Sequence, residues 1–347
     1  MEEFKDRYEQ IVRRTKEDLA AYEAPEKVSF AERIRRLFGK KRPEKDLVNW
    51  PAGMLLLGLW EAGEDEAVRA YIDRWIDRGM PLQRADDALA GYVILGLYGM
   101  YGEERYRTAA EKIHEMLAAA PKDAEGGIIY NPAAGNDAVF ADGTGMAVMF
   151  LAKYGMLFRD AQALTAARQM LAAYRLHGME ENTGLPWHGY VLRDDRQCGL
   201  VGWGRAVGWI LMGVSVYLQE TAQLPDAEIA AYYRGLCDAA EAFRQEGGLV
   251  PWHLAKDETK TDTSATAMIE YAMLLGGYRG ADADNSAAVF QALWDSAPEG
   301  EVGGALAECL DFGNHPQKYG HYPWGQGAAL AALSLFRRLQ LRGGESR

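Results

Sequence analysis

Residues 203–217 read WGRAVGWILMGVSVY, a run in which apolar side chains and glycines take nearly every position around the helical turn. Apolar residues recur in it at three- and four-residue spacing, which is the period of an α-helix. A helix that is apolar on all sides requires burial on all sides. Five more segments have this character, so that the six begin 36, 56, 61, 59 and 62 residues apart: 50–60, 86–101, 142–154, 203–217, 262–275 and 324–339.

Charged amphipathic segments alternate with the apolar ones, at about 5–22, 64–78, 104–119, 161–175, 226–245 and 285–297. An amphipathic helix buries one face, so six of them are suited to surround six fully buried helices. Strand signals are scarce, and the uneven spacing argues against a solenoid of fixed period. The sequence therefore predicts an all-α fold, an (α/α)6 barrel with six inner and six outer helices.

Composition narrows the classes of partner. The chain of 347 residues is 48% hydrophobic and 25% charged, which is typical of a globular protein with a large core. Its 50 acidic and 38 basic residues give a net charge of −12. Nucleic acid is therefore not expected as a partner, because a phosphate backbone requires a basic surface. The cysteines Cys198, Cys237 and Cys309 are far apart and form no CxxC motif, so we expect neither a disulfide framework nor a zinc site.

The N-terminal 20 residues are charged throughout and lack the apolar core of a signal peptide. No run of about 18 apolar residues predicts a membrane span. We therefore expect a cytoplasmic protein with no membrane partner. The basic run ERIRRLFGKKRPEK, at 32–45, is interpreted as a solvated linker. The domain prediction is accordingly an N-terminal helical extension and linker at 1–45, followed by a barrel catalytic domain at 46–347.

Tryptophans and charged residues collect at the starts of the apolar helices. In the predicted barrel the inner helices run the same way, so these starts meet at one end. Indole rings stack on sugar rings, and carboxylates or arginine bind hydroxyl or acid groups, so the set is typical of a carbohydrate site. The candidates are Trp50, Asp86, Asp87, Asp142, His188, Trp203, Arg205, Trp209, Asp262, Tyr322 and Trp324.

Each candidate also has a structural interpretation. An aspartate at a helix start is commonly an N-cap, and a tryptophan beside glycine is commonly core. Arg205 follows Gly204 in an otherwise apolar helix, so it requires an anion, supplied either by the protein or by a ligand. The GWGRAVG run has the wrong glycine spacing for a dinucleotide site, and the histidines lack the spacing of zinc ligands. We therefore expect no metal and no cofactor.

Six strings of the chain form a recognisable series: NWPAGMLLLGL (49–59), FADGTGMAVMFLAKYG (140–155), LPWHGY (185–190), GWGRAVGW (202–209), TDTSATAMIEYAM (261–273) and YPWGQGAALAAL (322–333). In this order they resemble glycoside hydrolase family 105, the unsaturated rhamnogalacturonyl hydrolases, and the related family 88 unsaturated glucuronyl hydrolases. The resemblance covers about 46–340. It implies an (α/α)6 barrel and a metal-free reaction on an oligosaccharide that begins with a 4,5-unsaturated uronic acid. In that reaction an aspartate protonates C4 and water adds at C5.

The resemblance also implies roles for individual residues. The family's acid/base aspartate corresponds to Asp142 in FADGTGM, and its second carboxylate to Asp86, with the adjacent Asp87 as the alternative. The histidine before Gly-Tyr corresponds to His188. Substrate-binding residues of the W-x-R-G-x-G-W string correspond to Trp203, Arg205 and Trp209, and Trp50 and Trp324 are expected to join them. The chain departs from the family pattern at four positions, Asn131, Phe140, Ala206 and Val207.

Carbon protonation near neutral pH requires an aspartic acid whose pKa is raised above about 3.9. A helix N-terminus stabilises the anion, so burial and a neighbouring carboxylate must outweigh it at Asp142. Arg205 or His188 is expected to bind the substrate carboxylate. Two alternatives remain: another (α/α)6 sugar enzyme, such as an inverting glycosidase or an epimerase, and a non-catalytic sugar-binding relative. We expect a monomer or a weak homodimer.

Overall fold

The computed structural model describes residues 2–23, 47–130, 132, 135, 137–256, 260–279 and 284–345. The linker at 32–45, the domain boundary at 45/46 and Asn131 lie outside them. Twelve α-helices occupy the described ranges, and they follow the predicted alternation. The inner helices are α3 (Trp50–Glu61), α5 (Asp87–Tyr101), α7 (Ala141–Phe158), α9 (Gly204–Glu220), α11 (Thr263–Leu275) and α13 (Pro323–Glu345). The outer helices are α1 (Glu2–Glu23), α4 (Asp65–Asp77), α6 (Glu104–Ala119), α8 (Ala161–His177), α10 (Ala227–Ala242) and α12 (Asp284–Asp295).

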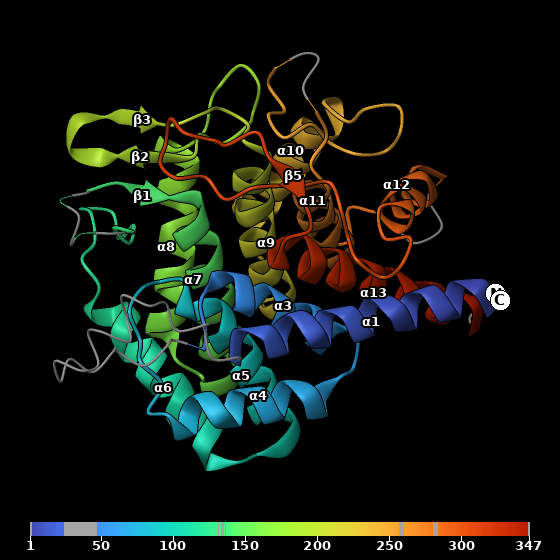
Figure 1. The fold of residues 1–347 in the computed structure, drawn as a ribbon. Helices are drawn as coiled ribbons and strands as arrows, with labels where there is room; N and C mark the ends of the chain where they lie inside the picture. The colour runs from blue at the N-terminus through green and yellow to red at the C-terminus, as the bar shows by residue number, and fades with distance from the viewer. Residues whose placement is uncertain are drawn as a thin grey trace, which may run out of the picture.

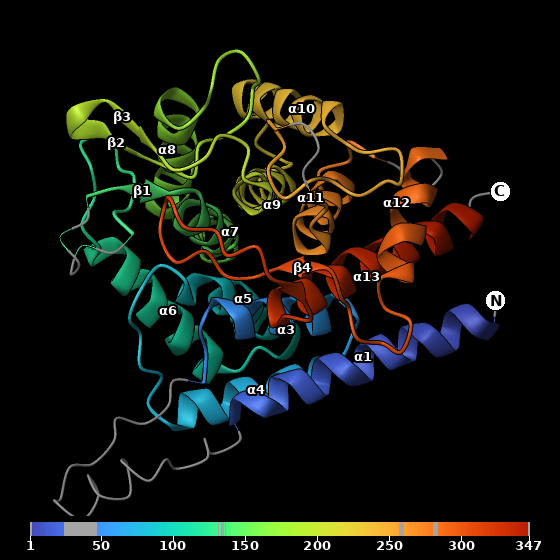
Figure 2. The same cartoon turned by 45° about the horizontal axis from the view of Figure 1, so that its top comes forward.

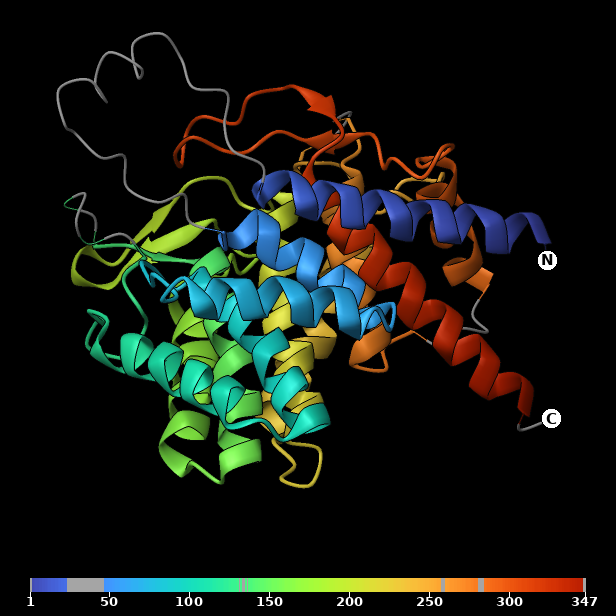
Figure 3. The ribbon, with the colours of Figure 1, turned by 60° about the horizontal axis from the view of Figure 1, so that its bottom comes forward.

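The inner helices form a closed ring, because each packs on the next in chain order and α13 packs back on α3. In Figure 2, α7, α9 and α11 are seen nearly end-on. The prediction of an (α/α)6 barrel is thus confirmed. Helix α1 packs on α3 and α13 as one of the outer helices, and Figure 3 shows it running along α13. The division into an extension and a catalytic domain stays a prediction.

Two seams of the inner ring depend on glycine. A Cβ on Gly327 of α13 would lie 2.3 Å from the Met54 carbonyl oxygen of α3. A Cβ on Gly145 of α7 would lie 2.3 Å from the Trp209 carbonyl oxygen of α9. Both separations are shorter than van der Waals contact and involve backbone, which moves only with the whole helix. Glycine therefore allows these helices to approach closely enough to close the ring.

Short strands gather at the end where the inner helices begin, at the top of Figure 1. Strands β1 (Val139–Phe140), β2 (Gly189–Val191) and β3 (Arg196–Cys198) form an antiparallel sheet, and β4 (Ala305–Leu306) pairs with β5 (Tyr319–Gly320). None exceeds three residues, which is too short for the alternation that marks a strand in sequence. These strands hold the loops around the open end of the barrel.

A polar network fills the opposite end of the barrel, with one side chain from each inner helix: Glu61, Tyr92, Lys153, Glu220, Tyr271 and Arg338. The Tyr271 hydroxyl donates to the Glu61 carboxylate at 2.8 Å, and Arg338 pairs with the same carboxylate. The Lys153 ammonium lies 4.3 Å from the centre of the Tyr92 ring. Buried polar groups are tolerated when they satisfy one another.

No helix in the described ranges is long and apolar enough to cross a membrane.

Candidate active site

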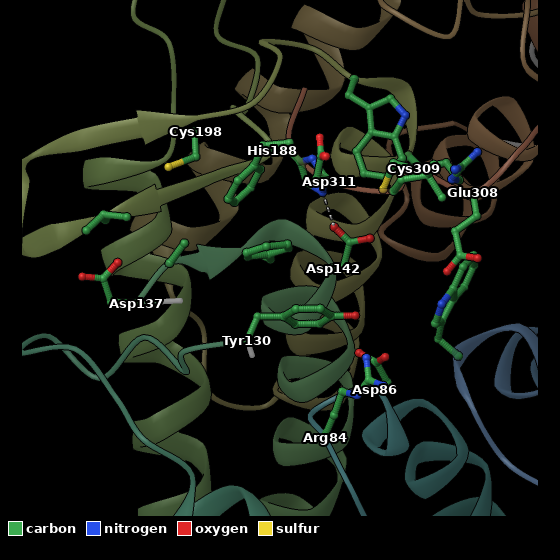
Figure 4. Close-up of a pocket in the computed structure, with 18 of the residues that line it drawn as sticks. Arg84, Asp86, Tyr130, Asp137, Asp142, His188, Cys198, Glu308, Cys309 and Asp311 are labelled. Atoms are coloured by element: carbon green, nitrogen blue, oxygen red, sulfur yellow. Dashed lines mark ion pairs between the residues drawn. The ribbon is translucent and has the colours of Figure 1, made fainter. Parts of the chain in front are cut away.

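A cavity of about 530 Å³ opens among the starts of the inner helices. It brings together six of the eight residues predicted for the site: Trp50, Asp86, Asp142, His188, Trp203 and Arg205. It also brings in residues that the sequence did not single out: Arg84, Tyr130, Asp137, Arg196, Glu308 and Asp311. Figure 4 shows most of these side chains around the hollow. The missed residues lie in loops or, for Arg196, in the short strand β3, where no helical period marks them.

The pair of Asp142 and His188 is assembled by the small sheet. Asp142 is the second residue of α7, directly after β1, and His188 directly precedes β2. Pairing of Phe140 with Gly189, and the bond from the Ala141 N–H to the His188 carbonyl at 3.0 Å, align the two side chains. The His188 Nε2 and an Asp142 carboxylate oxygen are 3.3 Å apart. Such a pair can hold one proton between two groups that both face the cavity.

Asp86 and Asp87 have different surroundings. The Asp87 carboxylate accepts the backbone N–H groups of Gln83 and Arg84, at 2.7 and 3.2 Å, and so fixes the turn before α5. Asp86 makes no capping bond with its side chain and lines the large cavity together with Asp142. The geometry therefore places Asp86, and not Asp87, opposite Asp142.

The electrostatics of Asp86 are those of a buried carboxyl group. The pKa of Asp86 is raised to about 6, chiefly by burial; the negative charges of Asp142 and Glu308 add to the rise, and Tyr130 and Arg84 oppose it. The Asp86 side chain is 7% exposed. We expected burial and a like charge to raise the pKa of Asp142; this combination is found at Asp86.

Tyr130 is the most informative of the missed residues. Its ring stacks on Phe140 at 4.6 Å, and its backbone N–H donates to the Ala138 carbonyl at 3.1 Å. Gly143 leaves room for it, because a Cβ there would lie 2.7 Å from the Tyr130 ring. The Tyr130 hydroxyl donates a hydrogen bond to Asp86. In Figure 4 the ring is seen between Asp142 above and Asp86 below.

Several buried polar atoms at this end of the barrel have no hydrogen-bond partner among the described residues. They are Asp86 Oδ1, Asp142 Oδ2, Thr144 Oγ1, His188 Nδ1, Trp203 Nε1 and His315 Nε2. A buried polar atom without a partner is costly, and native proteins rarely leave one without water or a ligand to meet it. The concentration of such atoms beside one cavity is what a polar ligand requires.

Arg205 is held by the protein itself. Its guanidinium lies 3.4 Å from the Asp262 carboxylate and donates to the carbonyls of Leu306 and Ala307, both at 2.9 Å. The sequence required an anion for this arginine, and the structure provides Asp262. Arg205 touches the cavity but chiefly joins α9 and α11 to strand β4. Its assignment to the substrate stays a prediction.

The tryptophans form two groups. Trp50 and Trp203 line the large cavity, whereas Trp209 is buried behind it and meets Trp50 edge-on at 6.4 Å. Trp324 lies 4.8 Å from Trp50 and lines an adjoining cavity of about 340 Å³. Stacking of sugar is therefore open to Trp50, whereas Trp203 is almost completely buried in the cavity wall and Trp209 supports Trp50 from behind. The part of the chain that the structure covers contains no group of three or more His, Cys, Asp or Glu residues able to hold a metal ion.

Asp86→Asn is expected to change how stability depends on pH. Because the pKa of Asp86 is raised to about 6, the folded protein holds this proton more tightly than the unfolded chain. The resulting stabilisation is fully present below about pH 4 and is lost as the pH rises through 6. A shift of about two units corresponds to about 3 kcal/mol. The measurement is urea unfolding at pH 4 and pH 8. Relative to wild type, the free energy of unfolding of the variant should be about 2 to 3 kcal/mol higher at pH 8 than at pH 4. If the free energies of unfolding of variant and wild type differ by the same amount at both pH values, the Asp86 carboxyl does not have a raised pKa in the folded protein.

Tyr130→Phe is expected to raise the pKa of Asp86 further, because the lost hydroxyl favoured the ionised carboxylate. One such hydrogen bond corresponds to about one pKa unit. The measurement is a ¹³C carboxyl titration, in which the Asp86 signal is the one missing from Asp86→Asn. Tyr190→Phe is the matched control, since the Tyr190 hydroxyl donates to Asp123 at 3.0 Å and lies outside the cavity lining. An unmoved Asp86 signal in Tyr130→Phe would show that the phenol does not act on this carboxyl.

Comparison with known proteins agrees with this geometry. The sequence profile of glycosyl hydrolase family 88 matches residues 28–339. The unsaturated rhamnogalacturonyl hydrolase YesR of Bacillus subtilis (strain 168) is 26% identical over an alignment of 313 residues, and the match covers 82% of this chain and 88% of YesR. A possible member of the GH105 family from Klebsiella pneumoniae subsp. pneumoniae MGH 78578 superimposes with a TM-score of 0.81, at 19% identity, over 95% of this chain and 93% of its own.

An unsaturated glucuronyl hydrolase from Bacillus sp. GL1 superimposes with a TM-score of 0.67, at 17% identity, over 86% of this chain and 89% of its own. These two structural likenesses bear on the fold, whereas the profile match covers most of the sequence, including the stretches that carry both carboxylates, His188 and Arg205. The chain is a glycoside hydrolase that belongs to glycosyl hydrolase family 88.

Proposed function

We propose that the protein releases a 4,5-unsaturated uronic acid from the non-reducing end of oligosaccharides that a polysaccharide lyase has produced. The observation that carries the proposal is the pair of carboxyl groups, Asp142 and Asp86, on one cavity, with His188 3.3 Å from Asp142 and with a buried Asp86 oxygen that has no hydrogen-bond partner among the described residues. The family supports an unsaturated uronyl hydrolase activity, and YesR, a similar protein, is an unsaturated rhamnogalacturonyl hydrolase.

The proposed reaction adds water across the C4=C5 double bond. Asp142 gives a proton to C4, which leaves positive charge at C5 that the ring oxygen shares. Water adds to C5 and returns a proton to the Asp142 carboxylate, so the acid is regenerated. C5 then carries the ring oxygen and a hydroxyl, which is a hemiketal. Its opening breaks the bond between C5 and the ring oxygen: the C5 hydroxyl becomes a ketone, and its proton passes to the former ring oxygen. C1 is then a hemiacetal, which releases the next sugar as an alcohol and becomes an aldehyde.

The neighbours of Asp142 suit this role. His188, 3.3 Å away, can share the proton that Asp142 needs before the reaction. Asp86 places a second carboxyl group in the same cavity, and its pKa of about 6 keeps that group close to neutral in weakly acidic solution. Phe140, Trp203 and Tyr130 shield these groups from water, which strengthens every charge interaction within the cavity.

The test follows absorbance near 235 nm, because the conjugated double bond is destroyed only if water adds across it. An unsaturated galacturonyl-rhamnose disaccharide and an unsaturated glucuronyl disaccharide are assayed in parallel. Loss of absorbance with either one establishes the reaction, and the compound that is consumed indicates which unsaturated uronic acid the enzyme accepts. No loss with either one, from protein whose helical circular dichroism shows it to be folded, would count against the proposal.

A further inference from the structure

A uronate substrate brings a negative charge into a cavity that already contains five acidic residues: Asp86, Asp137, Asp142, Glu308 and Asp311. The carboxylate of the substrate therefore needs a cation to bind it. Three arginines line the same cavity: Arg84, Arg196 and Arg205. The question is which of the three has a guanidinium available for a ligand.

Arg205 is fully engaged by the protein, and Arg196 has one side-chain partner. Arg205 is 1% exposed, pairs with Asp262 and donates to two backbone carbonyls, and its guanidinium lies 4.8 Å from the centre of the Trp203 ring. Arg196 donates to the Cys198 sulfur at 3.2 Å from strand β3. A carboxylate bound at Arg205 would have to compete with Asp262, which is completely buried and has no other cation within 4 Å among the described residues.

Arg84 differs from both. Its guanidinium has no hydrogen bond or ion pair with any described residue, although it lies close enough to Asp86 to lower the pKa of that carboxyl. The base of its side chain is fixed, because the Arg84 N–H donates to Asp87 at 3.2 Å and the Arg84 carbonyl accepts the Asp87 N–H at 3.1 Å. Figure 4 shows Arg84 beside Asp86, on the side of Tyr130 away from His188.

We propose that Arg84 binds the carboxylate of the unsaturated uronate, an inference that rests on the function proposed above. A guanidinium binds a carboxylate through two parallel hydrogen bonds and so fixes its plane. The carboxylate is conjugated with the C4=C5 bond, so fixing its plane also fixes the face of the double bond that Asp142 meets. Arg84 thereby selects acidic sugars over neutral ones, while Arg205 maintains the wall of the cavity.

The test compares the unsaturated disaccharide acid with its methyl ester, which keeps the double bond but lacks the charge. The acid and the ester differ in intrinsic reactivity, but this difference is the same in every variant. A change in the ratio of kcat/KM for the acid to kcat/KM for the ester therefore reports on the side chain that binds the carboxylate. We expect Arg84→Gln to lower kcat/KM for the acid by roughly 10- to 100-fold and to change that for the ester by less than about threefold. Arg84→Lys should recover part of the loss, since it restores the charge without the planar pair of donors.

Arg196→Gln is the comparison variant, because it removes an arginine from the same cavity at another position. The proposal is overturned if Arg84→Gln keeps the wild-type ratio, if it slows acid and ester equally, or if Arg196→Gln is the variant that loses the preference. Calorimetric binding of both compounds to Asp142→Asn, with and without Arg84→Gln, measures the same preference without turnover. If wild type consumes neither compound, the proposed function fails, and the binding measurement still decides whether Arg84 holds the carboxylate.

Discussion

Asp142→Asn is expected to abolish turnover of the unsaturated disaccharide while leaving its binding intact. The amide has nearly the shape of the carboxyl group but cannot give a proton to carbon, and removal of a general acid costs about 10²- to 10⁴-fold in rate. The partner of this side chain, His188, stays in place because the pairing of β1 with β2 holds its backbone. The measurement is the rate of absorbance loss near 235 nm, with binding followed by calorimetry.

A matched control for this variant is Asp194→Asn. Asp194 is exposed at the turn between β2 and β3, and it pairs with the neighbouring Arg193. The same change of charge and shape at that position should leave kcat within about twofold of wild type, because an exposed ion pair contributes little. Near-normal kcat in Asp142→Asn would exclude Asp142 as the acid. Loss of both binding and turnover, with an early thermal transition, would indicate a structural role instead.

Arg205→Gln is expected to lower the free energy of unfolding by about 3 to 5 kcal/mol, which is the usual cost of removing one partner of a buried ion pair. The Asp262 carboxylate is completely buried and would lose its cation, while the carbonyls of Leu306 and Ala307 would each lose one donor. Urea unfolding followed by circular dichroism at 222 nm measures the loss. The exposed Arg196→Gln should change the same quantity by less than about 0.5 kcal/mol.

A second substitution separates the two causes of this loss. In Arg205→Gln/Asp262→Asn the buried charge is gone, yet the asparagine oxygen still accepts the Ser264 and Leu306 N–H groups that the aspartate accepted at 2.9 and 3.1 Å. The double variant should therefore be more stable than Arg205→Gln alone. An unchanged unfolding midpoint in Arg205→Gln, together with lost turnover, would show that this arginine binds the substrate and does not stabilise the cavity wall.

The pattern of twelve helices was predictable because it depends on residues that are close together in the sequence. Whether a segment is apolar on one side or on all sides depends only on residues within a few turns, and that difference separates the outer helices from the inner ones. The run at 203–217 is an example: every residue from Gly204 to Tyr217 is buried. Even the relative positions of Asp142 and His188 at one end followed, since inner helices of such a barrel start at the same end.

The short strands were not predictable from alternation, and they decide fine positions in the site. Strand β1 is two residues long, yet its pairing with β2 sets the 3.3 Å approach of His188 to Asp142. Tyr130 was missed for a related reason. It lies in a loop with no helical period, and its relation to Asp86 depends on a hydrogen bond between segments 44 positions apart in the chain.

The sequence by itself determined the ring of helices, the end at which they open, and the residue types that gather there. Only the tertiary structure decided that Asp86 rather than Asp87 shares the large cavity with Asp142, that Arg205 is bound by Asp262, and that the Arg84 side chain has no ion pair with a described residue. The physical reason is range. Helical periodicity acts over three or four residues, whereas the partners of Arg205 lie 57 to 102 residues away and are fixed only when the ring closes.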